Sequence, residues 1–142
     1  MSAIFLAGNN QLEIFDFQCD DWESIHPYNT SFKIRIRSTG EGFCSRSQEE
    51  FSCLSSWECD SKAFRTFVEQ LQQMYYFETN LVEFKDIAYG GNLCFELDRM
   101  GHIRISGLLF GNHGDQHLAF AFNGDQTCLI PFLDGLKAFL KG

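Results

Sequence analysis

The segment at residues 92–107, NLCFELDRMGHIRISG, can be paired almost residue by residue as an antiparallel hairpin. If residues 99–101 form a three-residue loop, Gly101 takes the left-handed position that such loops require. Apolar side chains then face apolar ones, and acids face bases, on alternate sides of the hairpin. A two-residue loop would set Leu97 against a base and is therefore rejected. The predicted pairs are Asp98–His102, Leu97–Ile103, Glu96–Arg104 and Phe95–Ile105.

The next segment, FGNHGDQHLAFAFNGDQT at residues 110–127, places His113, Asp115 and His117 at every second position. On one strand these three metal-ligand types would share a face. Pairing Leu109 with Leu118, however, puts Gly107 opposite Phe120 and Ile105 opposite Phe122, and leaves a loop at residues 112–115 with a turn composition. His113 then lies in the loop and His117 on a strand, so we expect no metal site. The recurring Gly-Asp-Gln is interpreted as two similar turn signals.

The rest of the chain shows short alternating runs that predict further strands at 3–8, 11–18, 31–38, 42–57, 81–88, 92–98, 102–110 and 116–123. Helical spacing of apolar residues predicts one helix at 61–76, with Asp60 as its N-cap, and a second at 131–140, with Pro131 in its first turn. These elements predict an α+β fold. We expect one domain over residues 1–142, with an antiparallel meander sheet of about seven or eight strands and two helices packed on it.

Composition limits the classes of function. The net charge is −8, so the surface should repel nucleic acid and anionic membranes and suit a basic protein partner, although ordinary solubility is an alternative explanation. No apolar run reaches the roughly 20 residues that span a bilayer, and the first residues lack the features of a signal peptide. We therefore expect a cytoplasmic protein whose cysteines are reduced.

The usual catalytic signatures are absent: the chain has no G-x-S-x-G, H-E-x-x-H or Walker motif. A Cys–His nucleophile pair brought together by the fold stays open, but we expect no catalytic residues and no cofactor. The basic stripe Lys33, Arg35 and Arg37 could bind phosphate, but in a protein that is acidic overall we expect it to face Glu13 or other carboxylates across the sheet.

Two segments combine aromatic rings with acids, CDDWESIHPY at 19–28 and MYYFE at 74–78. Tyrosine and tryptophan beside acids are typical of protein-recognition surfaces, although such rings also cap the edge of a core. The predicted partner-binding residues are Asp20, Asp21, Trp22, Glu23, Tyr75 and Tyr76.

Three segments of the second half carry a family resemblance: FVEQLQQMYYFETNLVEF, LCFELDRMGHIRISGLL and LAFAFNGDQTCLIPFLDGL. Over roughly the last 80 residues they resemble the wall-associated-protein immunity (WapI-like) family of small bacterial proteins. That family is linked to contact-dependent toxin systems, in which a small acidic protein binds and neutralises its toxin. The resemblance implies a toxin domain as the partner.

We therefore expect a protein-binding module without catalytic activity, for which an immunity protein against a bacterial toxin is the leading candidate. The alternative is a small hydrolase or ligand-binding domain with a pocket between sheet and helix. No oligomeric state follows from the sequence.

The six cysteines should all be free thiols, because they are scattered through a chain expected in a reducing compartment, and most should be buried. Thiol titration after denaturation, on protein kept from air, is expected to count all six. Two or fewer would contradict the assigned compartment.

Overall fold

The computed structural model describes residues 1–20, 22, 28–41, 48–111 and 114–141. In these residues the chain forms four strands and a helix, and then repeats that plan, which confirms the predicted α+β class. The elements are β1 (Ser2–Ala7), β2 (Asn10–Cys19), β3 (Thr30–Glu41), β4 (Gln48–Cys59), α1 (Ser61–Tyr75), β5 (Leu81–Lys85), β6 (Asn92–Leu97), β7 (His102–Phe110), β8 (His117–Asp125), the 3₁₀ helix η2 (Gln126–Cys128) and α2 (Leu129–Lys141).

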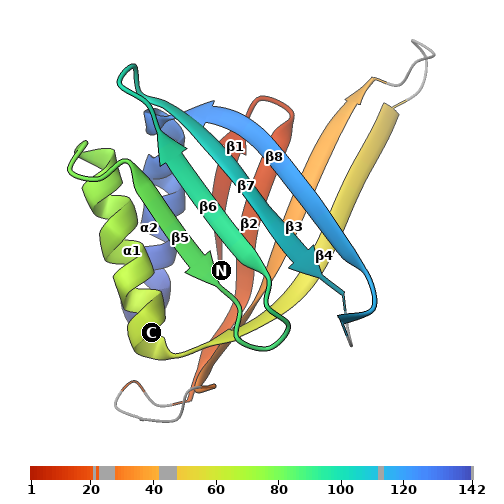
Figure 1. The fold of residues 1–142 in the computed structure, drawn as a ribbon, viewed down its shortest axis with the longest axis vertical. Coiled ribbons are helices and arrows are strands. Elements are labelled where there is room, and N and C mark those ends of the chain that lie inside the picture. Colours follow the sequence, from red (N-terminus) through yellow and green to blue (C-terminus); the bar gives the residue numbers. More distant parts are fainter. Residues whose placement is uncertain (21, 23–27, 42–47, 112–113, 142) are drawn as a thin grey trace.

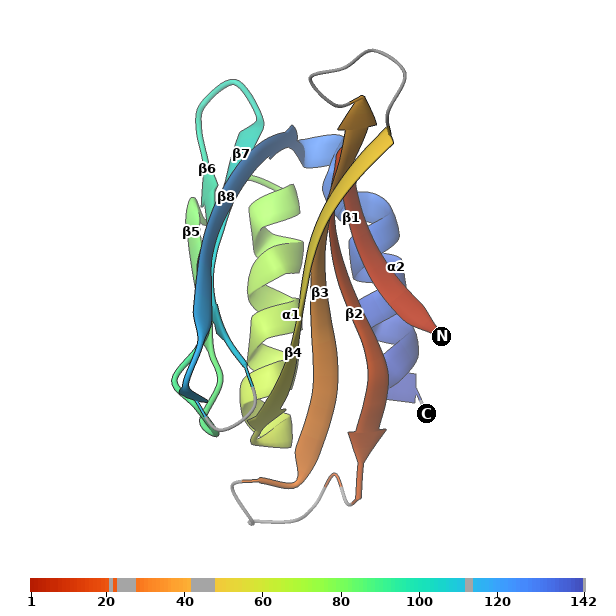
Figure 2. The same cartoon turned by 90° about the vertical axis from the view of Figure 1, so that its right-hand side faces the viewer.

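The strands form two separate antiparallel sheets. The first sheet has the order β1-β2-β3-β4 and the second has the order β5-β6-β7-β8. The meander order is confirmed, but the expected single sheet is wrong. The physical reason is α1, which follows β4 and packs against β5, so the chain leaves the first sheet before it begins the second. The sheets lie as facing layers, and both helices close the same side of the molecule (Figures 1 and 2).

The two hairpins of the second sheet for which a register was predicted, β6–β7 and β7–β8, both have that register. Leu97 pairs with Ile103, and Leu109 pairs with Leu118. Gly101 adopts a φ of +86°, the left-handed conformation that the three-residue loop requires. The Asp98 carboxylate accepts hydrogen bonds from the backbone N–H of His102 (2.9 Å) and from that of Met100 (2.8 Å). These bonds lower the pKa of Asp98, so the ionised carboxylate stabilises the turn.

The first sheet has one buried and one charged face, as the alternation at residues 31–38 predicts. Phe32, Ile34 and Ile36 are buried. On the opposite face, the basic stripe pairs with carboxylates as expected: Lys33 with Asp16 (3.3 Å), Arg35 with Glu13 (3.1 Å) and Arg37 with Glu50 (2.5 Å). The Lys33–Asp16 and Arg37–Glu50 pairs are exposed and contribute little to stability, whereas the Arg35–Glu13 pair is partly buried.

The predicted helices are both present. The side chain of Asp60 caps α1 by accepting a hydrogen bond from the Lys62 N–H at 2.9 Å. The second helix begins at Leu129 rather than at Pro131, because η2 leads into it. Neither described helix has the length and apolar character needed to cross a membrane. Of the strands expected at 42–57, residues 42–47 lie outside the described part of the chain, and β4 continues to Cys59.

Aromatic rings join the sheets and α2 into one hydrophobic core. Phe5, on β1, contacts Phe95 and Phe122 of the second sheet, with ring centroids 6.4 and 6.2 Å away, and Phe132 of α2 at 6.1 Å. Tilted and edge-to-face ring pairs of this kind are favourable beyond the area that they bury.

The cysteines that the structure describes are free: Cys19, Cys53, Cys59, Cys94 and Cys128. Cys44 lies outside the described residues. The expectation that most are buried is wrong, because among these five only Cys59 is buried and the other four are half-buried, with Cys53 and Cys128 packed against the core. Burial, with a smaller effect of the Asp60 and Asp86 charges, raises the pKa of the Cys59 thiol to about 12. Since a thiolate is the reactive form, Cys59 should be inert in the folded chain.

Helix α2 crosses β1 at Gly135, where a Cβ atom would lie 2.5 Å from the Ala3 Cα atom. Gly135→Ala should therefore lower the free energy of unfolding by about 2 kcal/mol, because the cost of overpacking exceeds the helix propensity gained. Urea denaturation would measure this change. Lys137→Ala, at an exposed position of the same helix, is the control and should change stability by less than about 0.5 kcal/mol. Equal stability of wild type and Gly135→Ala would contradict the close contact.

Candidate functional site

A bulge in β2 shapes the surface that carries Trp22. In the pairing of β2 with β3 the register shifts between Phe15 and Gln18, so Asp16 and Phe17 together oppose Phe32. Asp16 adopts a φ of +54°, a conformation that aspartate tolerates better than most residues. The extra residue leaves Asp16 exposed and turns Phe17 towards the inner face of the sheet.

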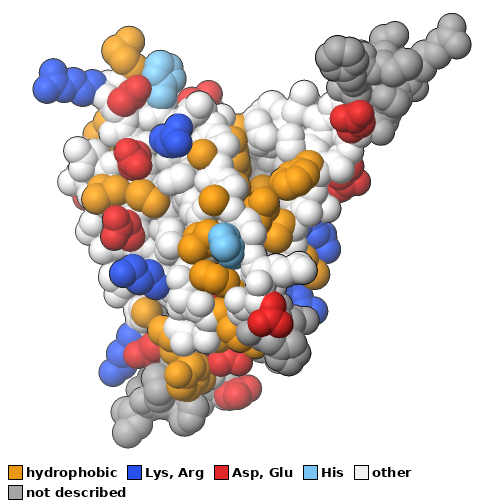
Figure 3. Space-filling view, turned by 45° about the vertical axis from the view of Figure 1, so that its right-hand side comes forward, with side chains coloured by type: hydrophobic (Ala, Val, Ile, Leu, Met, Phe, Trp, Pro, Cys, Tyr) orange, Lys and Arg blue, Asp and Glu red, His pale blue; other side chains and the backbone are white. Residues whose placement is uncertain are grey.

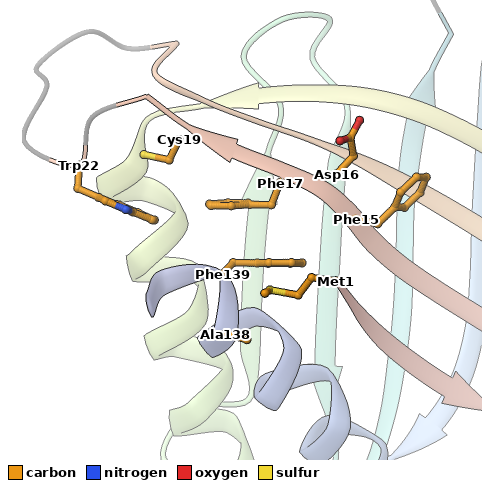
Figure 4. Close-up of a pocket in the computed structure, with 8 residues that line it drawn as sticks. All are labelled: Met1, Phe15, Asp16, Phe17, Cys19, Trp22, Ala138 and Phe139. Atoms are coloured by element: carbon orange, nitrogen blue, oxygen red, sulfur yellow. The ribbon is translucent and has the colours of Figure 1, made fainter. Parts of the chain in front are cut away.

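Phe17 is the centre of an aromatic cluster at this end of the molecule (Figure 4). Its ring stacks parallel to Phe139 of α2 at 4.9 Å and contacts Phe64 of α1 at 4.8 Å. It also stacks on Trp22 at 5.9 Å. One half-buried ring therefore ties β2, both helices and the segment after β2 to one another.

Beside this cluster lies an open pocket of about 640 Å³ between β2 and α2. Its walls are mostly apolar and aromatic: Met1, Phe15, Asp16, Phe17, Cys19, Trp22, Ala138 and Phe139. The one carboxylate in this set, Asp16, points away from the Phe17–Phe139 stack and pairs with Lys33 (Figure 4). The lining that the structure describes holds no histidine and no converging set of polar groups, so its chemistry suits apolar contact rather than acid–base catalysis.

Trp22 is held in place on the surface rather than free. The Arg65 guanidinium of α1 lies over its ring at 4.5 Å, a cation–π contact. Nearby, Asp20 is exposed, and its backbone N–H donates to the Asn29 carbonyl at 3.1 Å. The buried Asn29 side chain in turn exchanges hydrogen bonds with Ser61 at the start of α1. The ends of this segment are thus fixed beside α1, whereas Asp21 and Glu23 lie outside the described residues.

The predicted tyrosines lie at the other end of α1. Tyr75 and Tyr76 form an edge-to-face pair at 5.2 Å, with Tyr75 packed against the core and Tyr76 61% exposed. Arg65 contacts Trp22 near the start of this helix, so roughly 15 Å of helix separates it from Tyr75. The structure therefore does not bring Trp22 and the tyrosines into one patch.

Sequence reasoning missed most of the residues that hold Trp22. Phe17 fits a simple alternating strand, and nothing in the local sequence marks the bulge that turns it inward. Arg65 and Phe139 come from helices distant in sequence, so only the assembled fold shows that they belong to this surface.

The structure describes only part of the histidine pattern, so the expected absence of a metal site there stays a prediction. His117 lies on β8, as predicted, while His113 lies outside the described residues. Within the described residues, no three His, Cys, Asp or Glu side chains are grouped so as to hold a metal ion.

Comparison with known families matches residues 7–142 to the immunity protein WapI-like family. The chain belongs to this family. The match covers nearly the whole chain, so the restriction of the resemblance to the last 80 residues was wrong.

A search of curated proteins finds no match for this WapI-like chain. Among solved structures, it is similar to a chain of the MRP1/MRP2 crystal structures from Trypanosoma brucei, with a TM-score of 0.56 and 8% identity. The similarity covers 99% of this chain and 82% of that chain. At this low identity the likeness shows a shared fold and nothing about function.

The aromatic cluster should depend on Phe17 far more than on its neighbour Phe15. Phe17→Ala should lower the free energy of unfolding by about 3 kcal/mol, because it removes a ring packed between β2 and both helices. Phe15→Ala is the matched control, since its ring faces outward beneath the Arg35 guanidinium at 4.6 Å, and should cost about 1 kcal/mol. Urea denaturation of both variants would measure the difference. Equal losses would contradict the inward rotation of Phe17 by the bulge.

Proposed function

We propose that this chain is the immunity partner of a bacterial toxin and that it neutralises the toxin by binding it. Membership of the WapI-like immunity protein family carries this proposal. Such a role requires a complementary surface rather than a catalytic centre, which agrees with the apolar lining of the pocket beside Trp22. We further propose that it acts in the cytoplasm, where reduced cysteines would persist.

The partner should be basic. Residues 1–60 contain ten acids and four bases, a net of −6, while residues 61–142 contain nine acids and seven bases, a net of −2. A field of this sign accelerates association with a positively charged partner and repels nucleic acid and anionic membranes. Asp20, with its neighbours in sequence Asp21 and Glu23, supplies part of this charge beside Trp22.

Trp22 would supply the apolar anchor of the interface. Arg65 and Phe17 already hold its ring, so binding would cost little side-chain entropy. Tyr75 and Tyr76 remain part of the proposal, but their position at the far end of α1 makes them a second contact area rather than an extension of the first.

A second candidate function is binding of a small apolar ligand. The pocket of about 640 Å³ between β2 and α2 favours it, because its volume and aromatic walls fall within the usual range of ligand sites. A small molecule that raises the melting temperature of wild type but not of Ala138→Trp, which fills the pocket, would support this function.

The toxin-immunity proposal can be tested by recovering the partner and then measuring protection. The tagged chain would be used to capture proteins from a native bacterial lysate, and each captured protein would be expressed in a host with and without this chain. Growth arrest by a captured protein, relieved by wild-type chain, is the expected result. Captured proteins that arrest no growth, or arrest that the chain does not relieve, would overturn the proposal.

Substitutions around Trp22 should separate the two kinetic effects in binding to that partner. Trp22→Ala should mainly raise the dissociation rate, whereas Asp20→Lys with Asp21→Lys should mainly lower the association rate and its dependence on salt. Surface plasmon resonance at low and high salt would measure both rates. Glu83→Lys, an equal charge change per substitution at an exposed position of β5, is the control for net charge. If both sets of variants bind like wild type, the interface lies elsewhere.

A further inference from the structure

The two sheets have four outer strands, and a helix packs against two of these strands. Helix α2 packs along β1, and α1 packs against β5. Within the described structure, β4 and β8 are the other outer strands, and neither has a helix along it (Figure 1). An uncovered outer strand presents unpaired backbone N–H and C=O groups to which another chain can add a strand.

One part of the β4 edge is already occupied. The Glu58 N–H donates to the Asp86 carboxylate at 2.9 Å, and the Ile87 N–H donates to the Glu58 carbonyl at 3.1 Å. The Ser55 hydroxyl donates to the Phe110 carbonyl at 2.7 Å, where β7 meets β4. Among the described residues, no other strand pairs with the remaining stretch, residues 48–54.

The bonds at Glu58 also fix which backbone groups are free. In an antiparallel strand the N–H and C=O groups of successive residues point to alternate sides. The register of β3 with β4 is unbroken from Thr30–Cys59 to Glu41–Gln48. Since Glu58 points its backbone groups away from β3, Glu50, Ser52 and Leu54 do so as well. Among the described residues, no other strand pairs with the outward donors and acceptors of these three residues.

Neither edge has the lysine or proline residues that most often prevent strand addition. Lysine and proline protect exposed edges, yet β4 (QEEFSCLSSWEC) and β8 (HLAFAFNGD) contain no lysine, arginine or proline. Instead β4 exposes large apolar side chains, with Phe51 59% and Leu54 49% exposed.

The two edges border a hollow. The two sheets approach each other where Ser55 of β4 meets Phe110 of β7 and then diverge, and Figure 3 shows hydrophobic side chains on both sides of the resulting notch. By strand alternation, Glu49, Phe51 and Cys53 share the side of β4 that faces the interior, in line with buried Trp57. Phe120, on the inner face of β8, packs against the core and leaves part of its ring uncovered.

The charges beside the β4 edge indicate which kind of strand can add to it. The described ends of this notch carry Glu49 and Glu50 on β4 and Asp115 before β8, and Arg37 pairs with Glu50 alone. A second copy of this chain would bring the same acids to the edge, whereas a strand with lysine or arginine side chains would compensate them.

We propose that an extended, basic segment of the partner adds as a fifth strand to the free edge of β4, pairing its backbone with Glu50, Ser52 and Leu54. The proposal rests on the toxin-immunity function for the identity of the partner, but the edge itself can be tested without the toxin. Side chains on one face of the added strand fill the hollow beside Phe51 and Cys53, and a base lies opposite Glu49.

The first experiment uses a capped heptapeptide of alternating lysine and valine, with a glutamate–valine peptide as control. In the chain alone, the amides of Glu50, Ser52 and Leu54 should exchange with deuterium quickly, while those of Phe51 and Cys53 should be protected by β3. The lysine peptide should slow exchange of the three outward amides by at least about tenfold, and the glutamate peptide should not. No protection at millimolar peptide, or equal protection by both peptides, would overturn the proposal.

The second experiment uses the recovered partner. Ser52→Pro removes one outward N–H without removing a bond to β3, and Ser52→Ala is the matched control. The proline variant should bind the partner at least about tenfold more weakly, with the β3–β4 amides still protected from exchange, while the alanine variant should bind like wild type.

If Ser52→Pro binds the partner as tightly as wild type, strand addition is overturned and the immunity function is unaffected. If the wild-type chain itself does not relieve growth arrest by the captured protein, the immunity function is overturned instead. If the amides of Glu50, Ser52 and Leu54 are already protected from exchange in the chain alone, and the chain sediments as a dimer, a second copy of the chain occupies the edge and the proposal is overturned.

Discussion

The contact of Phe5 with Phe95, Phe122 and Phe132 holds the two halves of this chain together. Each sheet is a local meander, and each could form its hydrogen bonds without the other. What fixes their mutual position is a small number of rings from β1, the second sheet and α2, together with the close approach of Gly135 to Ala3. Because rings pack with defined geometry, this core fixes which strands are covered by helices and which are left at an edge.

The two surfaces that follow from this arrangement lie at opposite ends of β3. The Trp22 cluster is next to its first residue, Thr30, through the pairing of Thr30 with Cys19, while the free edge of β4 accompanies its last residues. Twelve residues of strand span about 40 Å, so a compact partner cannot occupy both surfaces with the same few side chains. A toxin that used both would have to reach along the first sheet, which a domain with an extended segment could do.

The sequence predicted those features whose causes are local. The register at Leu97–Ile103, the left-handed Gly101 and the Asp60 cap each follow from residues close in sequence, and the structure confirms them. The division into two sheets depends on how α1 packs against β5, which no local pattern encodes. The candidate site shows the same limit. Trp22 and Asp20 were singled out by their composition, but the bulge at Asp16 and the contacts of Trp22 with Arg65 and Phe17 arise only in the assembled fold.

The contact between β1 and α2 also orders the assembly of the molecule in time. During synthesis β1 emerges early, but the helix that covers it is made more than a hundred residues later. Until then the nascent first sheet has two unprotected edges instead of one, and Phe5 has no ring from the second half to pack against. Long-range contacts of this kind slow folding and expose apolar surface in the meantime. The first half of the chain should therefore be prone to aggregation on the ribosome, and the yield of folded protein should depend on the supply of chaperones.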